Sequence, residues 1–330
     1  MLQDDILALL RSDPGGYRSG EAMSRTLGVS RAAVWKAVEA LRSAGYEIVS
    51  APNRGYCLSA APDDLRAGEI AAALSGRVIG REVVCLDTVD STNSEVKRRS
   101  AGGAPEGLAV LADEQTGGRG RRGNAFQSLR GKGLYCSVLL RPACPPEDLG
   151  QLTAWTAVAV CRAIRDCCGA ECGIKWTNDL ILGGRKVCGI LTELELEAES
   201  AAALSVVIGV GINVGQTAGD FGPELSPIAT SLSQALGRSV RRAELAACLL
   251  QALDEMYAAF PGGKADYLAE YRRRCVTTGR EVALLRGGER VTAFAQEVDD
   301  QFSLVCRLPG GRVETVTAGE VSVRGLLGYV

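Results

Sequence analysis

The chain has 330 residues, of which 46% are hydrophobic, and a net charge of −2 at pH 7. That length allows two or three domains with a hydrophobic core, and the near-neutral charge excludes a surface that is basic throughout, so any site for nucleic acid has to be local. Asp4 and Asp5 stand where a signal peptide needs positive charge, and no apolar run is long enough to span a membrane. We therefore expect a cytoplasmic protein with no membrane partner.

The cysteines favour reduced thiols over a metal or disulfide site. The chain has 12 cysteines and no histidine, and no CxxC pair occurs. Most of the cysteines, such as Cys136, Cys188 and Cys306, lie inside apolar runs that are typical of strands. We expect buried, reduced thiols. The absence of histidine also excludes catalysis by a Ser-His-Asp or Cys-His arrangement.

Residues 1–62 predict a small winged helix-turn-helix domain. Helical periodicity occurs three times, and the second and third helices begin after Ser19 and Ser30, which are good capping residues. Gly28 makes the turn between these two helices. Two strand segments follow, at 46–50 and 55–59. The order of helix, helix, turn, helix and hairpin is typical of a winged helix-turn-helix.

The rest of the chain has two successive patterns of predicted secondary structure. Residues 68–275 alternate strand and helix patterns, which indicates an α/β or α+β domain with a large sheet. The expected strands are 82–87, 107–113, 133–140, 173–176, 178–182, 186–196 and 204–214. The expected helices are 91–99, 147–168, 241–260 and 264–273. Residues 276–330 are expected to form a small β-barrel of short strands, with turns at Gly287-Gly288, Asp299-Asp300 and Pro309-Gly310-Gly311.

The stretch EQTGGRGRRG, residues 114–123, combines four glycines with three arginines. Glycine lets the backbone approach a ligand closely, and arginine supplies fixed positive charge with forked donors. The stretch fits neither a P-loop nor a GxGxxG turn. An anion-binding loop, a disordered segment that binds nucleic acid and a solvated turn all remain open from this stretch alone.

Four other stretches accompany this loop: DSTNSE at 90–95, KWTNDL at 175–180, RKVCGI at 185–190 and GVGIN at 209–213. Taken alone, GVGIN favours a tightly packed strand over a ligand site. In this order, with the loop, the set closely resembles the biotin protein ligases. The N-terminal domain further resembles the bifunctional members, which also repress the biotin operon.

The resemblance implies a fold and a two-step reaction. The central domain would be like those of class II aminoacyl-tRNA synthetases and lipoate ligases, and the C-terminal domain would be SH3-like. Biotin would attack MgATP to give biotinoyl-adenylate and pyrophosphate. A lysine of a biotin carboxyl carrier protein, from acetyl-CoA carboxylase or another biotin-dependent carboxylase, would then attack the adenylate. Such catalysis needs positioning and charge neutralisation rather than a covalent enzyme intermediate.

The same resemblance assigns roles to residues of this chain. Catalysis would rest on Lys186, Arg121 and Arg119. The residues expected to contact biotin are Ser91, Thr92, Asn93, Gln115, Gly118, Arg119, Arg121, Lys186, Gly189 and Ile190. Those expected to contact ATP or the adenylate are Arg121, Arg122, Phe126, Lys175, Asn178, Asp179, Lys186 and Asn213. Asp179 would also serve Mg²⁺.

Three positions depart from the family pattern. Asn124 stands where the family usually has Arg, Phe126 where it has Trp, and Thr177 where it has Pro. Phe126 can still pack on an adenine face, with less area than Trp. Asn124 removes one positive charge near the phosphates. Both substitutions are therefore expected to bear on the affinity for ATP.

The N-terminal domain predicts contacts to operator DNA. The residues expected there are Ser30, Arg31, Ala32, Trp35, Lys36 and Arg54. Trp35 could equally be a core residue, and a winged helix can also bind protein. Two functions follow: a ligase that is also a repressor and dimerises when the adenylate binds, or a ligand-sensing repressor without ligase activity.

Overall fold

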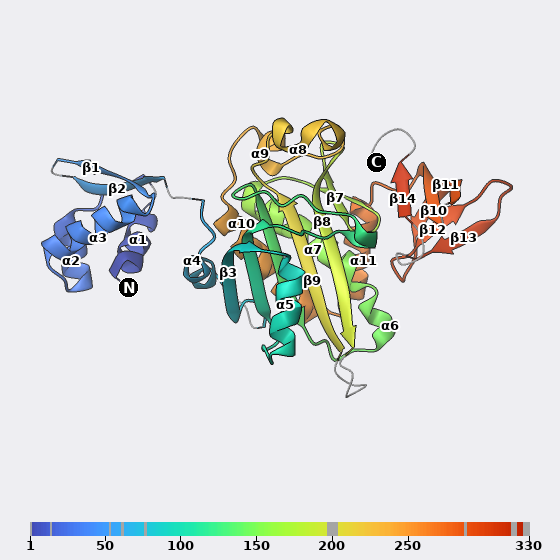
Figure 1. Cartoon of the computed structure of the whole chain (residues 1–330), viewed down its shortest axis with the longest axis horizontal. Helices are drawn as coiled ribbons and strands as arrows, with labels where there is room; N and C mark the ends of the chain where they lie inside the picture. Colours follow the sequence, from blue (N-terminus) through green and yellow to red (C-terminus); the bar gives the residue numbers. More distant parts are fainter. Residues whose placement is uncertain are drawn as a thin grey trace. The chain divides into compact units, whose positions relative to one another are not determined.

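The computed structural model describes residues 2–13, 15–52, 54–60, 63–75, 78–196, 204–286, 289–317 and 322–325. The chain divides into two compact units, Met1–Asp63 and Asp64–Val330, which we describe separately (Figure 1). Within the described residues, no helix has both the length and the apolar character needed to cross a membrane.

The first unit has the predicted order of elements. It consists of α1 (Leu2–Arg11), α2 (Gly20–Leu27), α3 (Arg31–Ser43), β1 (Glu47–Ala51) and β2 (Gly55–Ala60). The hydroxyls of Ser19 and Ser30 accept hydrogen bonds from the amides of Ala22 and Ala33, so both predicted helix caps are confirmed. Gly28 ends α2 with a φ of +65°, a conformation that glycine adopts without strain.

The guanidinium of Arg42 ties α3 to the strand that follows it. Its Nε and Nη2 donate to the carbonyl of Ile48 at 2.9 and 2.6 Å, and Nη2 also donates to Ser50 Oγ at 2.6 Å. In the same helix, Val34, Val38 and Leu41 are buried in the core of this unit. The third helix and the wing are therefore fixed to each other.

A seven-stranded sheet dominates the second unit, in the order β3-β4-β5-β9-β8-β7-β6. The strands are β3 (Glu82–Val89), β4 (Leu108–Gln115), β5 (Gly133–Leu140), β6 (Gly173–Lys175), β7 (Asp179–Leu182), β8 (Arg185–Leu196) and β9 (Leu204–Asn213). Only β3 and β4 pair in parallel, and the other neighbours are antiparallel. All seven predicted strands of this region are confirmed to within a few residues.

The helices of this unit are α4 (Ala67–Ala72), α5 (Thr92–Ala101), α6 (Pro146–Leu149), α7 (Leu152–Cys168), α8 (Ala218–Leu225), α9 (Leu232–Leu236), α10 (Arg242–Ala259) and α11 (Lys264–Arg274). The prediction of one helix over 147–168 was wrong, because the chain breaks it between α6 and α7. There, the amide of Gln151 bonds to the carbonyl of Asp148 in a three-residue turn. The short helices α4, α8 and α9 were not predicted, since so few residues carry little periodicity.

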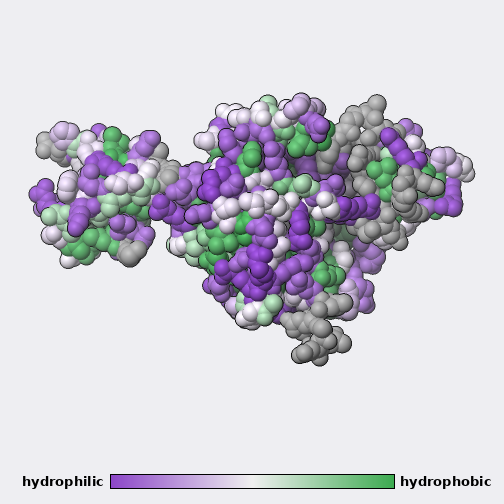
Figure 2. All heavy atoms as spheres, in the orientation of Figure 1, coloured by the Kyte–Doolittle hydropathy of each residue, from purple (hydrophilic) through white to green (hydrophobic). Residues whose placement is uncertain are grey.

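Helices cover both faces of the sheet, α5 on one and α7 with α10 on the other (Figure 1). Alternate residues of β4 show this division. Leu108 and Val110 pack with Val96 of α5, whereas Ala109 and Leu111 belong to the main core that contains α7 and α10. Figure 2 shows hydrophilic side chains over the outer surface of α5.

The cysteines confirm the expectation of reduced thiols, since all 12 are free and most are buried. Burial raises the pKa of Cys85 and of Cys306 to about 11 in each case, so both stay protonated at neutral pH.

The C-terminal residues form a five-stranded antiparallel sheet in the order β13-β12-β11-β10-β14. Its strands are β10 (Arg280–Arg286), β11 (Glu289–Val298), β12 (Leu304–Arg307), β13 (Val313–Val316) and β14 (Ser322–Gly325). The turns predicted at Asp299-Asp300 and at Pro309-Gly310-Gly311 are confirmed, and Gly287-Gly288 lies outside the described residues. The division into 68–275 and 276–330 remains a prediction.

One tryptophan joins this sheet to the site. Trp176 directly precedes the Thr177-Asn178-Asp179 turn and is buried. Its Nε1 donates to the carbonyl of Phe302 at 2.9 Å, and its amide donates to Thr277 Oγ1 at 2.8 Å. The C-terminal sheet therefore helps to hold that turn in place.

We expect Trp176→Phe to lower the free energy of unfolding of this unit by about 1–3 kcal/mol, because the buried carbonyl of Phe302 loses its donor. Urea unfolding followed by circular dichroism measures the change. Trp35→Phe is the control, since Trp35 is 57% exposed in the other unit and should change stability by less than about 0.5 kcal/mol. Equal effects of the two substitutions would contradict this role of Trp176.

Candidate functional site

A pocket lies in the second unit beside the N-terminus of α5, between the loop that follows β4 and the strands β8 and β9. The predicted site residues that line it are Ser91, Thr92, Asn93, Gln115, Arg119, Arg121, Phe126, Asn178, Lys186, Gly189 and Ile190. The structure therefore brings all five sequence motifs together around one cavity. GVGIN contributes Gly209, Val210 and Gly211 to it.

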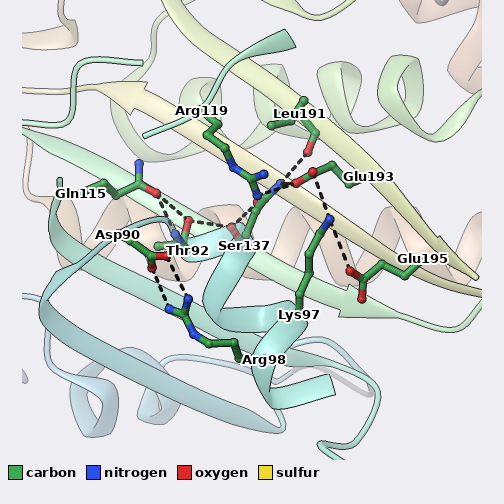
Figure 3. Close-up of polar contacts among 11 residues, drawn as sticks. Asp90, Thr92, Lys97, Arg98, Gln115, Arg119, Ser137, Leu191, Glu193 and Glu195 are labelled. Atoms are coloured by element: carbon green, nitrogen blue, oxygen red, sulfur yellow. Dashed lines mark hydrogen bonds and ion pairs between the residues drawn. The ribbon is translucent and has the colours of Figure 1, made fainter. Parts of the chain in front are cut away.

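Hydrogen bonds fix the polar end of the pocket. The amide of Thr92 and its Oγ1 donate to Gln115 Oε1 at 2.8 and 3.1 Å. Gln115 Nε2 donates to Ser128 Oγ at 2.8 Å, so both ends of this side-chain amide are held. Ser137 Oγ lies 2.7 Å from Thr92 Oγ1, which links the helix to β5 (Figure 3).

Asn93 is buried and held from three sides. Its Oδ1 accepts from Ser137 Oγ at 2.6 Å, and its Nδ2 donates to Glu193 Oε2 at 2.7 Å and to the carbonyl of Leu191 at 3.4 Å. A Cβ added to Gly209 would lie 2.1 Å from Asn93 Oδ1. Asn93 can occupy this position only because β9 carries a glycine there.

The ring of Phe126 packs against two further glycines, Gly211 and Gly189. A Cβ on Gly211 would lie 2.7 Å from its ring, and a Cβ on Gly189 would lie 3.5 Å away. The ring also meets Tyr135 edge-on, with centroids 6.3 Å apart. The glycines of GVGIN and KVCGI therefore leave bare strand backbone on which side chains of the pocket lie.

Lys186 reaches the pocket because of a break in strand register. The pairing of β7 with β8 shifts between Leu180 and Ile181, and the partners of these residues are Cys188 and Lys186. Residues three apart on a regular strand face opposite ways, whereas such a bulge turns Lys186 to the side of Gly189. Lys186 Nζ would lie 3.1 Å from a Cβ on Gly189, so the side chain runs over that glycine.

Three cationic side chains of the pocket have protein partners. Lys186 Nζ lies 2.7 Å from Asp179 Oδ1, Arg119 Nη2 lies 3.2 Å from Glu193 Oε2, and Arg121 Nη1 donates to Asn178 Oδ1 at 2.9 Å. Burial, with repulsion from Arg122 as a second cause, lowers the pKa of Arg121 below its ordinary value. The pocket thus concentrates positive charge and supplies carboxylates beside it.

Two carboxylates at the edge of the pocket are stabilised as anions. Burial opposes ionisation of Glu193, but hydrogen bonds from Asn93 and Lys97 and the charges of Lys97 and Arg119 outweigh it, so its pKa falls. The hydrogen bonds from Arg98 lower the pKa of Asp90, which precedes Ser91, to about 2. Both groups are therefore charged at neutral pH. Figure 3 shows the basic side chains that contact them, Arg98 at Asp90 and Lys97 with Arg119 at Glu193.

The other predicted residues lie near the pocket without lining it. Asp179 pairs with Lys186, which lines the pocket, and Lys175 is buried in the neighbouring strand β6. Asn213 Nδ2 donates to the carbonyl of Thr230 at 3.1 Å, so its amide anchors that segment. Arg122 is exposed on the loop, and Gly118 makes room for the carbonyl of Phe126.

Sequence reasoning missed Ser137, Glu193 and the separate roles of Gly209 and Gly211. Ser137 is the one hydroxyl-bearing or charged position besides Tyr135 in the buried strand GLYCSVLL, and such a residue signals a buried polar contact. Glu193 had no signal of this kind, because an alternating strand end commonly carries carboxylates.

In the first unit, the predicted DNA-contacting residues share an exposed surface. Arg31, Ala32, Trp35 and Lys36 are exposed at helical spacing on α3, and Ser30 caps that helix. The alternative of Trp35 as a core residue is therefore wrong. The guanidinium of Arg54 stacks on the ring of Tyr17, 4.2 Å from its centroid.

Comparison with known proteins identifies both units. Residues 85–213 match the model of the biotin/lipoate A/B protein ligase family, and residues 2–57 match an HTH domain. The bifunctional ligase/repressor of Escherichia coli (strain K12) is 31% identical over 97% of this chain and 96% of its own length. The chain belongs to the biotin/lipoate A/B protein ligase family.

Two further proteins are similar to about three quarters of this chain. The bifunctional ligase/repressor of Bacillus subtilis (strain 168) is 40% identical over 256 residues, which is 78% of each chain. The biotin protein ligase from Aquifex aeolicus in complex with biotin and ATP superposes with a TM-score of 0.63 at 28% identity, over 74% of this chain and 99% of that one.

We expect Gly209→Ala to lower both the stability of the second unit and the affinity of the pocket for its ligand. The added methyl group collides with the buried amide of Asn93, so it should destabilise the unit by about 1–3 kcal/mol and raise the KM for the ligand of the pocket. Gly215→Ala is the control, because a Cβ there would lie 3.7 Å from the nearest backbone oxygen, an ordinary contact. A Gly209→Ala protein that matched Gly215→Ala in both unfolding and KM would contradict this reading.

Proposed function

We propose that this chain activates biotin with MgATP, transfers biotin to a lysine of a biotin carboxyl carrier protein, and represses biotin genes when the adenylate is bound. The observation that carries the proposal is a pocket in which a cation-rich loop, Lys186 and three strand glycines surround a polar helix end. The relatives named as biotin ligases and as ligase/repressors support it.

Biotin would lie with its ureido ring at the polar end of the pocket. Ser91, Thr92, Asn93 and Gln115 offer hydroxyl and amide groups there. The valeryl chain would pass Gly189 and Ile190, and Gly118 lets the loop close over it. The carboxylate would meet Arg119 and Arg121, which are the loop cations that line the pocket.

The nucleotide would lie toward Lys186. Phe126 offers a ring face for adenine, Arg122 and Lys175 offer charge to the phosphates, and Asn178 and Asn213 offer amide groups. A carboxylate oxygen of biotin then attacks the α-phosphorus of ATP, and pyrophosphate leaves. Lys186 would neutralise the charge that develops between the two anions. The amine of the carrier lysine next attacks the acyl carbon, and AMP leaves.

Magnesium would arrive with ATP as part of the substrate. Among the residues that the structure describes, no group of three or more Cys, Asp or Glu side chains is placed to hold a metal ion. Asp179 is a single carboxylate beside Lys186. One carboxylate fits Mg²⁺, which commonly takes its remaining ligands from phosphates and water.

Repression would need two copies of the chain. One winged helix contacts few phosphates, so a monomer should bind DNA weakly at physiological salt, whereas a two-fold dimer can read a palindromic operator. β7 pairs with β8 as far as Gly189, and the amide of Ile190 still donates to the carbonyl of Asn178. In the described part of the chain, β8 therefore has an unpaired edge from Leu191 to Leu196, where Leu194 is 51% exposed. The second copy and the carrier protein would compete for this edge.

We expect Lys186→Ala to slow adenylate formation by about 10²–10³-fold, as loss of a donor to a developing charge does. Pyrophosphate release from enzyme, biotin and ATP measures this rate. Lys264→Ala, which changes a half-buried lysine in α11 that does not line the pocket, is the control and should keep the wild-type rate. Wild-type release by Lys186→Ala would remove Lys186 from the reaction.

Transfer of labelled biotin to a carrier domain separates this function from its alternative. A ligand-sensing repressor without ligase activity would bind biotin and operator DNA but leave the carrier unlabelled. The intact loop and Lys186 favour the ligase.

We expect biotin with ATP to convert the protein from monomer to dimer and to raise its affinity for the operator of its own biotin genes. Linkage requires operator DNA to raise the affinity for the adenylate by the same factor. Sedimentation and DNA footprinting, each with and without ligand, measure both effects. Arg31→Ala should lose the footprint but keep ligand-induced dimerisation, and indifference of the wild type to ligand in both assays would exclude this regulation.

A further inference from the structure

Glu193 contacts both Asn93, at the polar end of the pocket, and Arg119, on the loop above it. Its Oε2 accepts from Asn93 Nδ2 at 2.7 Å and lies 3.2 Å from Arg119 Nη2, and its Oε1 accepts from Lys97 Nζ at 3.1 Å. Only 21% of the side chain is exposed. Figure 3 shows Arg119 and Lys97 directed at this carboxylate from the loop and from α5.

The loop is tied to the sheet at two separate points. Arg121 holds Asn178, whose carbonyl accepts from the amide of Ile190, and Arg119 holds Glu193 three residues further along β8. Leu191, which lines the pocket, lies between these two attachments. The two arginines therefore hold the loop across the width of the pocket.

Arg119 keeps donors for a ligand while it holds Glu193. Only Nη2 donates to this carboxylate, and within the described residues its Nε and Nη1 have no hydrogen bond to a protein acceptor. A planar guanidinium fixed along one edge presents its remaining N–H groups in a defined direction. Glu193 can thus orient Arg119 without occupying it.

We propose that Glu193 is a positioning residue of the ligase reaction: it latches the loop through Arg119 and thereby retains the biotinoyl-adenylate in the pocket. The role of Arg119 toward the ligand rests on the proposed function. The latch itself rests on the contacts of the ligand-free protein.

The test compares Glu193→Gln with Glu195→Gln. Glutamine at 193 keeps an oxygen that can accept from Asn93 but loses the charge that attracts Arg119. Glu195 also pairs with Lys97, at 3.4 Å, but has no hydrogen bond or ion pair to the described residues of the loop, so it is a matched control. We expect Glu193→Gln to release added biotinoyl-adenylate about 1.5- to 5-fold faster, as for a partly exposed ion pair, and Glu195→Gln to release it at the wild-type rate.

Two further variants distinguish the latch from a general loosening of the fold. In an Arg119→Gln background, Glu193→Gln should no longer accelerate release, because its partner is gone. Glu193→Asp keeps the charge and should restore part of the retention. Equal acceleration with and without Arg119, or no acceleration in either background, would overturn the proposal.

A ligand-free experiment separates failure of this inference from failure of the proposed function. Trypsin should cut the loop after Arg119, Arg121 or Arg122 faster in Glu193→Gln than in the wild type or in Glu195→Gln. If the wild type forms no adenylate but this difference in cutting persists, the latch stands and the proposed chemistry fails. Equal cutting of all three proteins overturns the latch whatever the enzyme does with biotin.

Discussion

The site depends on the absence of side chains at the centre of the sheet. Gly209 and Gly211 on β9 and Gly189 on β8 leave backbone exposed where the side chains of Asn93, Phe126 and Lys186 lie. A methyl group at Gly209 or Gly211 would occupy the space of Asn93 or Phe126. The pocket is thus formed by side chains from α5, the loop and β8 that rest on bare strands, and its shape follows from three missing Cβ atoms.

Two of the cations that line the pocket are paired with carboxylates before any ligand binds. Lys186 has Asp179 and Arg119 has Glu193 as partners, so neither cation is left in a partly buried pocket without a counter-charge. Burying an unpaired charge is costly, and these partners reduce that cost in the ligand-free protein. An anionic substrate would then enter an existing set of ion pairs, where it shares donors or replaces a carboxylate. This exchange keeps the electrostatic cost of both states low.

Much of this arrangement could be predicted from the sequence. The features that could not be predicted depend on contacts between residues that are distant in the sequence. Local signals located the caps Ser19 and Ser30, the strands and the motifs, because each depends on neighbouring residues. The break between α6 and α7 could not be predicted, since it lies at a turn where the side chain of Gln151 donates from Nε2 to Gln301 Oε1, far along the chain. Glu193 was missed for the same reason: its partners Asn93 and Arg119 are distant in sequence, and only the fold brings them to one carboxylate.

The three tryptophans of the chain lie in different surroundings, which gives the protein built-in optical reporters. Trp155 and Trp176 are buried in the second unit, whereas Trp35 is exposed at the centre of the polar face of α3. An indole in water emits at longer wavelength than one in an apolar core, so the red edge of the emission belongs to Trp35. Contact of α3 with a base or a phosphate would alter that edge alone. Occupancy of the helix-turn-helix can therefore be followed by fluorescence without a label, in the same cuvette in which the ligase acts.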